Sequence, residues 1–447
     1  MTGAKAKALL EAPILPTLLR LAAPGLLLVV FQSAISVSDT HFVGRLGTEP
    51  LAGLALVFPL VMLLQMTSAG AMGGGISSAI ARALGAGDSA RARALVVHGL
   101  VIAVIAGLVF TLFVLLFGRG IYRLLGGDGA ALAAALAYSN VLFGGAVLVW
   151  IANTFASVLR GTGNTLVPAL ALVAASLVHI PLSAALILGW GPFPQMGIAG
   201  AGLAYIVGFA LASVGTGLYI WRSPLWPQRG DWRLVGRQFR EILRVGLISS
   251  VSALQTVFTA VVLTGLVGRF GTAALAGYGV GVRLELLQVP LAFAIGQALV
   301  VLVGTNIGAG RPERAKRTAF IGAAIAAGIC LAIGATVALF PRLWIGLFST
   351  DPAVLDSGAA YLRIVGPFYP FMGAGIALYF ASQGAARVVW PVLAGTARLV
   401  IVIGGGLIAL ALAAPLAALY WVIALGIVIW GSATIWAVRA SEWGRPG

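Results

Sequence analysis

The stretch Val43-Gly-Arg-Leu-Gly-Thr-Glu-Pro-Leu-Ala-Gly53 returns almost unchanged as Val267-Gly-Arg-Phe-Gly-Thr-Ala-Ala-Leu-Ala-Gly277. The two stretches agree at eight of eleven positions and lie 224 residues apart. Leu84-Gly-Ala-Gly-Asp-Ser-Ala-Arg91 likewise corresponds to Ile307-Gly-Ala-Gly-Arg-Pro-Glu-Arg314 at a spacing of 223. The spacing of 223 also relates Asp128 to Asp351, Tyr138 to Tyr361, Gly161 to Gly384 and Pro168 to Pro391. A constant spacing across separate segments is typical of an internal duplication, so the sequence predicts two homologous halves.

The chain is far more apolar than a water-soluble protein. Of its 447 residues, 60% are hydrophobic and 9% are charged, whereas about 25% are charged in a typical soluble domain. A helix needs about 20 apolar residues to cross the hydrocarbon layer, and the apolar runs predict twelve such helices. The predicted spans are 16–43, 51–81, 94–117, 131–158, 167–189, 198–221, 241–267, 274–303, 318–340, 354–382, 389–413 and 416–438. Runs this long do not fit the tilted strands of a membrane barrel, so the fold class is an all-α membrane protein.

Each half of the duplication holds six predicted spans. Because six crossings return the chain to the same side, both halves have the same orientation and should be related by a pseudo-twofold axis along the membrane normal. We predict an N-lobe over residues 1–221, a cytoplasmic linker over 222–240 and a C-lobe over 241–447. Carriers built in this way bind substrate near mid-membrane, at the interface of the repeats.

The formal net charge of +16 is explained by membrane topology. With a cytoplasmic N-terminus, the inside segments hold most of the Lys and Arg residues, as the positive-inside rule requires. The inside set is Lys5, Lys7, Arg20, Arg82, Arg91, Arg93, Arg160, Arg222, Arg229, Arg233, Arg237, Arg240, Arg244, Arg311, Arg314, Lys316, Arg317, Arg387, Arg439 and Arg445. The outside set is Arg45, Arg119, Arg123, Arg269 and Arg342. We therefore predict a multi-pass inner-membrane protein with both termini in the cytoplasm, in contact with membrane lipid and not with nucleic acid.

Two of the twelve acidic residues, Asp39 and Glu285, lie well inside predicted spans. An ionised side chain at the bilayer centre costs about 2.5–3.5 kcal/mol on the insertion scale, and such residues mark ion and substrate pathways. Ser36 lies three residues before Asp39 and shares its helix face, while the corresponding position in the second half is the apolar Leu263. Asp39 is therefore predicted to be functional in the first half; local pairing with Arg45 is the alternative.

Two interpretations of Glu285 stay open: an ion pair with Arg363 or Arg398, or an acid that faces substrate. Polar and aromatic residues around it make the second half a candidate substrate surface. The predicted substrate-binding residues are Glu285, Gln255, Phe258, Tyr278, Gln288, Phe293 and Arg283.

The sequence contains few of the residues that usually catalyse reactions or bind metals. It has one cysteine and three histidines, His41, His98 and His179, and no pair of them has the helical spacing of a zinc site. We therefore predict no enzyme, no cofactor and no metal. His179 is either a hydrogen-bonded core residue or a group that handles protons.

Glycine and proline inside the spans predict irregular helices. Gly70 and Gly73–Gly75 serve either close helix packing or a break in the second span. Pro24, inside the first span, removes a backbone hydrogen bond and predicts a bend.

Several short motifs, in order along the whole chain, resemble the multidrug and toxic compound extrusion (MATE) transporters. They are Asp39-Thr40 with Phe42-Val43-Gly44-Arg45-Leu46-Gly47, then Gly85-Ala86-Gly87-Asp88, Arg160-Gly161-Thr162-Gly163-Asn164, Phe193-Pro194-Gln195-Met196-Gly197-Ile198-Ala199-Gly200-Ala201 and Asn306-Ile307-Gly308-Ala309-Gly310. The resemblance implies twelve helices in two lobes and cation-coupled antiport of bulky, often cationic, organic compounds. It also implies that Asp39 is the coupling acid and that Pro24 is the position at which the first helix bends.

The sequence departs from the pattern of sodium-coupled members of that family. Their fifth helix carries Asn-Ile-x-Leu-Asp, where this chain has His179-Ile-Pro-Leu-Ser183, and a threonine of the sixth helix is Tyr205 here. The acids of their second lobe fall near Gln255–Thr256 and Met372–Gly373, so neither is kept. An Asp with His, Ser and Tyr is a poor cage for a hard cation but suits a proton. The predicted coupling residues are therefore Asp39, His179, Ser183 and Tyr205, with the proton as coupling ion.

The sequence thus predicts a proton-coupled multidrug antiporter that works as a monomer. The main alternative is a lipid or lipid-linked glycan flippase of the same superfamily, which would favour a more cationic centre than Arg283, Arg363 and Arg398 supply. A channel is disfavoured because one chain already carries its own twofold repeat. A major-facilitator carrier is disfavoured because the loop at residues 85–93 lacks the charged signature of that class.

Overall fold

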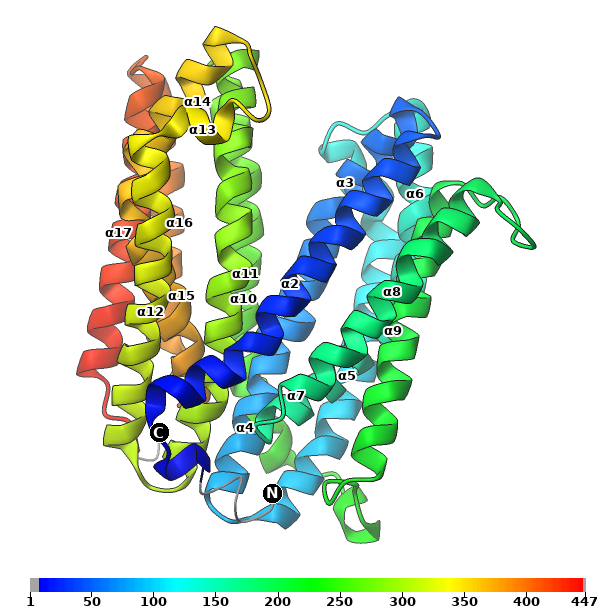
Figure 1. The fold of residues 1–447 in the computed structure, drawn as a ribbon, viewed down its shortest axis with the longest axis vertical. Coiled ribbons are helices and arrows are strands. Elements are labelled where there is room, and N and C mark those ends of the chain that lie inside the picture. Colours follow the sequence, from blue (N-terminus) through cyan, green and yellow to red (C-terminus); the bar gives the residue numbers. More distant parts are fainter. Residues whose placement is uncertain (1–7, 445–447) are drawn as a thin grey trace. The chain divides into compact units, whose positions relative to one another are not determined.

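The computed structural model describes residues 8–444, and within this range the chain forms helices and turns without a strand. Lys5, Lys7 and Arg445 of the predicted inside set lie outside the described residues. The main helices are α2 (Ile14–Gly44), α3 (Thr48–Gln65), α4 (Gly73–Gly85), α5 (Ser89–Leu124), α6 (Gly129–Gly144), α7 (Ala146–Gly161), α8 (Leu166–Leu188), α9 (Ile198–Trp221), α10 (Gly236–Gly268), α11 (Thr272–Gly308), α12 (Pro312–Leu339), α13 (Pro341–Ile345), α14 (Pro352–Val365), α15 (Tyr369–Gly384), α16 (Val389–Ala411) and α17 (Leu416–Ala440) (Figure 1).

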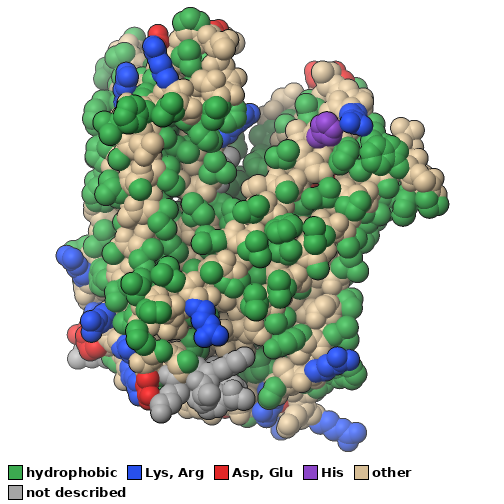
Figure 2. Space-filling view, in the orientation of Figure 1, with side chains coloured by type: hydrophobic (Ala, Val, Ile, Leu, Met, Phe, Trp, Pro, Cys, Tyr) green, Lys and Arg blue, Asp and Glu red, His purple; other side chains and the backbone are tan. Residues whose placement is uncertain are grey.

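The predicted all-α membrane fold is confirmed. Among the described residues, eleven helices are long and apolar enough to cross a membrane, and the count is twelve when α6 and α7, which meet at an angle of 49°, form one span. Many large apolar side chains on these helices are exposed; Leu108, Leu112 and Leu116 form one such row along α5. A row of this kind is typical of a helix that faces hydrocarbon, and green apolar side chains are spread over the whole face that Figure 2 shows.

Of the described residues, 20–246 form one compact unit (unit 1), and 8–19 with 247–444 form a second (unit 2). These boundaries differ from the predicted lobes in two places. The segment 8–19 at the start of the chain packs in unit 2, and residues 222–246, which include the predicted linker, pack in unit 1. Both α2 and α10 therefore begin in one unit and continue into the other.

The helix contacts within the two units correspond pair by pair. In unit 1, α4 packs on α7, α5 on α7, α3 on α6, α8 on α9, and α9 on both α6 and α7. In unit 2, the equivalent contacts join α11 to α15 and α14, α12 to α15, α16 to α17, and α17 to both α14 and α15. The internal duplication of the sequence therefore corresponds to a repeated pattern of helix–helix contacts in the two units.

The second span is irregular at its glycines. A π-helix, η1 (Met66–Met72), separates α3 from α4. A Cβ on Gly73 would lie 2.6 Å from Ser157 Oγ, and one on Gly75 would lie 2.9 Å from the carbonyl oxygen of Ile242. The glycines therefore permit close packing, as one interpretation predicted. The span is not broken at them; it continues through a π-helical stretch, where its winding changes.

Candidate functional site

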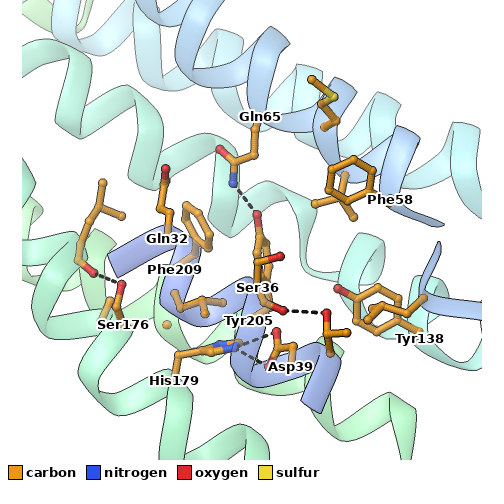
Figure 3. A pocket seen from close by; sticks show the side chains of 18 of the residues that line it. Gln32, Ser36, Asp39, Phe58, Gln65, Tyr138, Ser176, His179, Tyr205 and Phe209 are labelled. Atoms are coloured by element: carbon orange, nitrogen blue, oxygen red, sulfur yellow. Dashed lines mark hydrogen bonds and ion pairs between the residues drawn. The ribbon is translucent and has the colours of Figure 1, made fainter. Parts of the chain in front are cut away.

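Unit 1 contains a partly open cavity of about 570 Å³ lined by α2, α3, α6, α8 and α9 (Figure 3). Most of its wall is apolar. Polar side chains also reach it: Gln32, Ser36, Asp39, Thr40, Gln65, Tyr138, Ser176, His179 and Tyr205. Asp39 is the acidic residue of this wall, and none of the described residues that line the cavity is Lys or Arg.

Asp39 is held by two side chains of α8. His179 Nε2 lies 3.0 Å from both carboxylate oxygens of Asp39, and Ser183 Oγ donates a hydrogen bond of 2.6 Å to Oδ1. Asp39 is 7% exposed, and both of its partners are buried. His179 and Ser183 can both form hydrogen bonds with one carboxylate because they are four residues apart and share a face of α8.

The contact between Asp39 and His179 can form in more than one protonation state. His179 Nε2 lies within hydrogen-bond distance of both oxygens of Asp39, and either the imidazole or the carboxyl group can supply the hydrogen. Two ionisable groups in such contact can share one exchangeable proton.

Tyr205 enters the cavity from α9 without a hydrogen bond to Asp39 among the described residues. Its ring meets that of His179 edge to face, with centroids 6.4 Å apart. Its hydroxyl accepts a hydrogen bond from Gln65 Nε2. Of the four predicted coupling residues, the structure therefore joins Asp39, His179 and Ser183 in direct contact. Tyr205 lies beside His179, as Figure 3 shows.

A buried polar chain, which the sequence analysis did not predict, continues from Tyr205 into α7. Asn153 Nδ2 donates to Gln65 Oε1 at 3.1 Å and to Ser68 Oγ, in the π-helix, at 2.8 Å. Further along α7, Arg160 Nη2 donates to Ser157 Oγ at 2.8 Å. Gln65 and Asn153 are polar residues inside apolar spans, and this signal alone could have identified them.

Glu285, the other acid inside a span, lies in unit 2. Its Oε1 accepts hydrogen bonds from the hydroxyls of Tyr361 and Tyr369. Among the described residues it forms no ion pair. Arg363 is exposed, and the guanidinium of Arg398 stacks 5.4 Å from the ring of Trp430. The interpretation of Glu285 as a direct ion pair is therefore not supported.

The other predicted substrate residues of unit 2 are only partly gathered around Glu285. Tyr278 is buried, and its ring packs against Tyr361 with centroids 5.3 Å apart. Gln288 lies one helical turn after Glu285, and its amide atoms are buried with no partner among the described residues. These two positions remain compatible with a polar ligand that approaches Glu285.

The remaining four lie elsewhere in unit 2. Gln255 donates a hydrogen bond of 2.7 Å to Thr396 Oγ1. Phe258 is 54% exposed, the ring of Phe293 packs on Phe380, and Arg283 stacks on Phe348. We find no single site that contains all seven predicted residues.

The predicted helix bend at Pro24 falls within a continuous helix. α2 runs from Ile14 to Gly44 with Pro24 inside it. Because Pro24 has no N–H, the carbonyl of Arg20, four residues earlier, lacks its helical donor. A bend at this point stays a prediction.

Comparison with known proteins supplies a family. The sequence profile of the family described as MatE matches residues 24–185 and 248–408, one segment in each half. The chain is 27% identical over 376 residues to a FAD transporter of Shewanella oneidensis, with 84% of this chain and 82% of that protein covered. It is 26% identical over 378 residues to a probable multidrug resistance protein NorM of Thermotoga maritima, covering 84% and 81%.

Solved structures agree with this result. A crystal structure of MATE in the bent conformation shares 25% identity with a TM-score of 0.89, and the match covers 98% of both chains. An outward-facing multidrug resistance MATE family transporter of the MOP superfamily shares 25% identity with a TM-score of 0.86, covering 97% of both chains.

Proposed function

The chain belongs to the MatE family, and on that premise we propose that it is a multidrug efflux transporter that exchanges protons for bulky, often cationic, organic compounds. Members of this family are transporters, so the chain is a membrane transporter and not an enzyme. The predicted resemblance to MATE transporters is thereby confirmed. The coupling ion and the cargo are our proposals.

The observation that carries the proposal is the carboxylate of Asp39 in the wall of the unit 1 cavity, bonded to His179 and Ser183. In the deprotonated state, the Asp39–His179 pair has a net negative charge. In the protonated state, the pair is neutral. A cationic substrate and a proton would therefore compete for the same charge, which is what antiport requires.

The donors around Asp39 favour a proton over sodium. A hard cation needs several oxygen ligands, whereas one of the two side chains bonded to the carboxylate, His179, offers a ring nitrogen, which suits a proton. One charge that moves through 100 mV supplies about 2.3 kcal/mol, to which the pH gradient adds.

The cavity lining favours amphipathic cations as cargo. Phe58, Tyr138 and Phe209 offer aromatic faces to a cation. One relative is named a FAD transporter, but a dinucleotide carries a pyrophosphate, and no Lys or Arg of the described lining is there to bind it. We therefore rank a flavin nucleotide below organic cations.

We keep Glu285 as a candidate second contact for cationic cargo. The hydroxyls of Tyr361 and Tyr369 hold one carboxylate oxygen, and the side chain is half-buried. Tyr138, which lines the unit 1 cavity, occupies the repeat position that corresponds to Tyr361. Tyr278 and Gln288 are the residues of unit 2 best placed to assist Glu285.

The decisive experiment is transport in everted membrane vesicles. We expect accumulation of a cationic dye to follow an imposed pH gradient and not an imposed sodium gradient, and Asp39→Asn to abolish it. Asp128→Asn, which changes an exposed acid, is the matched control and should transport normally. Dye transport that survives in Asp39→Asn would refute the role of Asp39. Dye transport driven by sodium alone would refute proton coupling, and a protein that moves labelled lipid but no dye would be a flippase.

A further inference from the structure

The segment 222–246, which we call the basic segment, follows α9 and has a fixed place in unit 1. It contains the 3-10 helix η2 (Arg229–Trp232) and the first turns of α10, and it lies below α9 in Figure 1. Ile242 and Val245 are buried, and the nitrogen of Val235 donates to His98 Nε2 at 2.9 Å. The ring of Phe239 packs on that of His98, with centroids 4.5 Å apart. The basic segment is therefore a folded surface.

The acidic residues of the basic segment are neutralised from inside unit 1. The segment holds Asp231 and Glu241. Asp231 accepts a bond of 2.9 Å from Arg93 Nε, and Glu241 pairs with both Arg82 and Arg91. Each of these acids therefore already pairs with an arginine from α4 or α5, outside the basic segment.

The arginines of the basic segment face outward. Six belong to it, and all are exposed: Arg222, Arg229, Arg233, Arg237, Arg240 and Arg244. Arg237 and Arg240 lie three residues apart, which places them in one stripe along α10. At 100° per residue, this stripe lies opposite the buried face formed by Ile242 and Val245. The stripe is thus presented away from the protein.

Tryptophans accompany these arginines. Trp221, Trp226 and Trp232 are each between 42% and 55% exposed. Tryptophan concentrates at the boundary between head groups and hydrocarbon. Charges that serve topology alone need neither tryptophan neighbours nor a fixed stripe. We propose that the basic segment is a binding surface for anionic phospholipid head groups, in which the arginines pair with lipid phosphates while the tryptophans lie at the interface.

The test uses the full-length protein in neutral detergent, with phosphatidylglycerol and phosphatidylcholine as probes and bound lipid counted by native mass spectrometry. The double variant Arg237→Gln/Arg240→Gln is compared with Arg119→Gln/Arg123→Gln, which removes two exposed arginines from α5. Each basic side chain near an anionic surface contributes about fivefold to binding. We therefore expect phosphatidylglycerol to bind the Arg237→Gln/Arg240→Gln variant about 25-fold more weakly than the unmodified protein. The control variant should bind phosphatidylglycerol as the unmodified protein does. Phosphatidylcholine should bind all three proteins equally.

The proposal would be overturned if both variants lost phosphatidylglycerol binding equally. It would also be overturned if the Arg237→Gln/Arg240→Gln variant bound phosphatidylglycerol as the unmodified protein does. Displacement of phosphatidylglycerol by inorganic phosphate, but not by chloride at the same ionic strength, would also overturn it by assigning the surface to a free anion. If the double variant does not fold, the unmodified protein still decides the matter: its phosphatidylglycerol binding must weaken as salt rises. Binding that is insensitive to salt would contradict the proposal.

Discussion

The hydrogen bond from Ser183 to Asp39 is 2.6 Å long, and removing this hydroxyl tests the proton site at the scale of one bond. The hydroxyl stabilises the carboxylate anion, and a hydrogen bond to a charged group contributes about 1.5–3 kcal/mol. In Ser183→Ala, the anionic form of the Asp39–His179 pair loses a donor, so the pair should bind its proton more tightly. We expect the pH midpoint of drug transport in proteoliposomes to move upward by about one unit.

The control for this prediction is Ser176→Ala on the same helix. Ser176 is buried and lines the cavity, but it donates to the carbonyl of Leu172 and not to Asp39. Its pH profile should match that of the unmodified protein. A profile that moves equally in both variants would mean that general changes in the cavity, and not the bond to Asp39, set the midpoint.

At the scale of the element, α4 and the start of α10 depend on a close approach of their backbones. A Cβ on Gly75 would lie 2.9 Å from the carbonyl oxygen of Ile242 and 3.1 Å from the nitrogen of Gly246. Because both atoms belong to the backbone, Gly75→Ala must push the two helices apart, at a cost of about 1–3 kcal/mol. We expect a lower midpoint of thermal unfolding in detergent.

Gly120→Ala, near the end of α5, provides the comparison, because nothing lies within 4 Å of the added carbon. Alanine favours a helix over glycine by about 1 kcal/mol, so this variant should unfold at the same temperature or a higher one. If Gly75→Ala is as stable as Gly120→Ala, the packing of α10 against unit 1 is looser than its contacts indicate.

At the scale of the whole molecule, the orientation in the membrane follows from the distribution of charge and is open to direct measurement. In a Cys330→Ser background, a cysteine in place of Gln228 should react only with a reagent supplied from the cytoplasm, because the basic segment is predicted to lie there. A cysteine in place of Gln195, in the loop before α9, should react only from outside. The readout is labelling of intact cells against everted vesicles; the reverse pattern would invert the topology.

The fold could be predicted from the sequence because its causes are local or repeated. Apolar runs long enough to span the bilayer give the helices, and the recurrence of residues 43–53 at 267–277 gives the two matching sets of contacts. His179 and Ser183 were predicted as coupling residues from the resemblance to MATE transporters, and the structure shows both in contact with Asp39. The π-helix and the packing of residues 8–19 in unit 2 were not predicted. Both features depend on packing between segments that lie far apart in the chain.

By itself, the sequence determined that this protein is a duplicated helical membrane protein with an acid in its first span, because hydrophobic length, internal repetition and the cost of a buried charge are properties of the chain. Only the tertiary structure decided which side chains meet that acid. It also decided that Gln65 and Asn153 extend the polar surroundings of Asp39 and that Asp231 and Glu241 pair with arginines of α4 and α5. The reason is that hydrogen bonds and ion pairs depend on distances of a few ångströms between residues separated by more than a hundred positions, and these distances are set by how the helices pack.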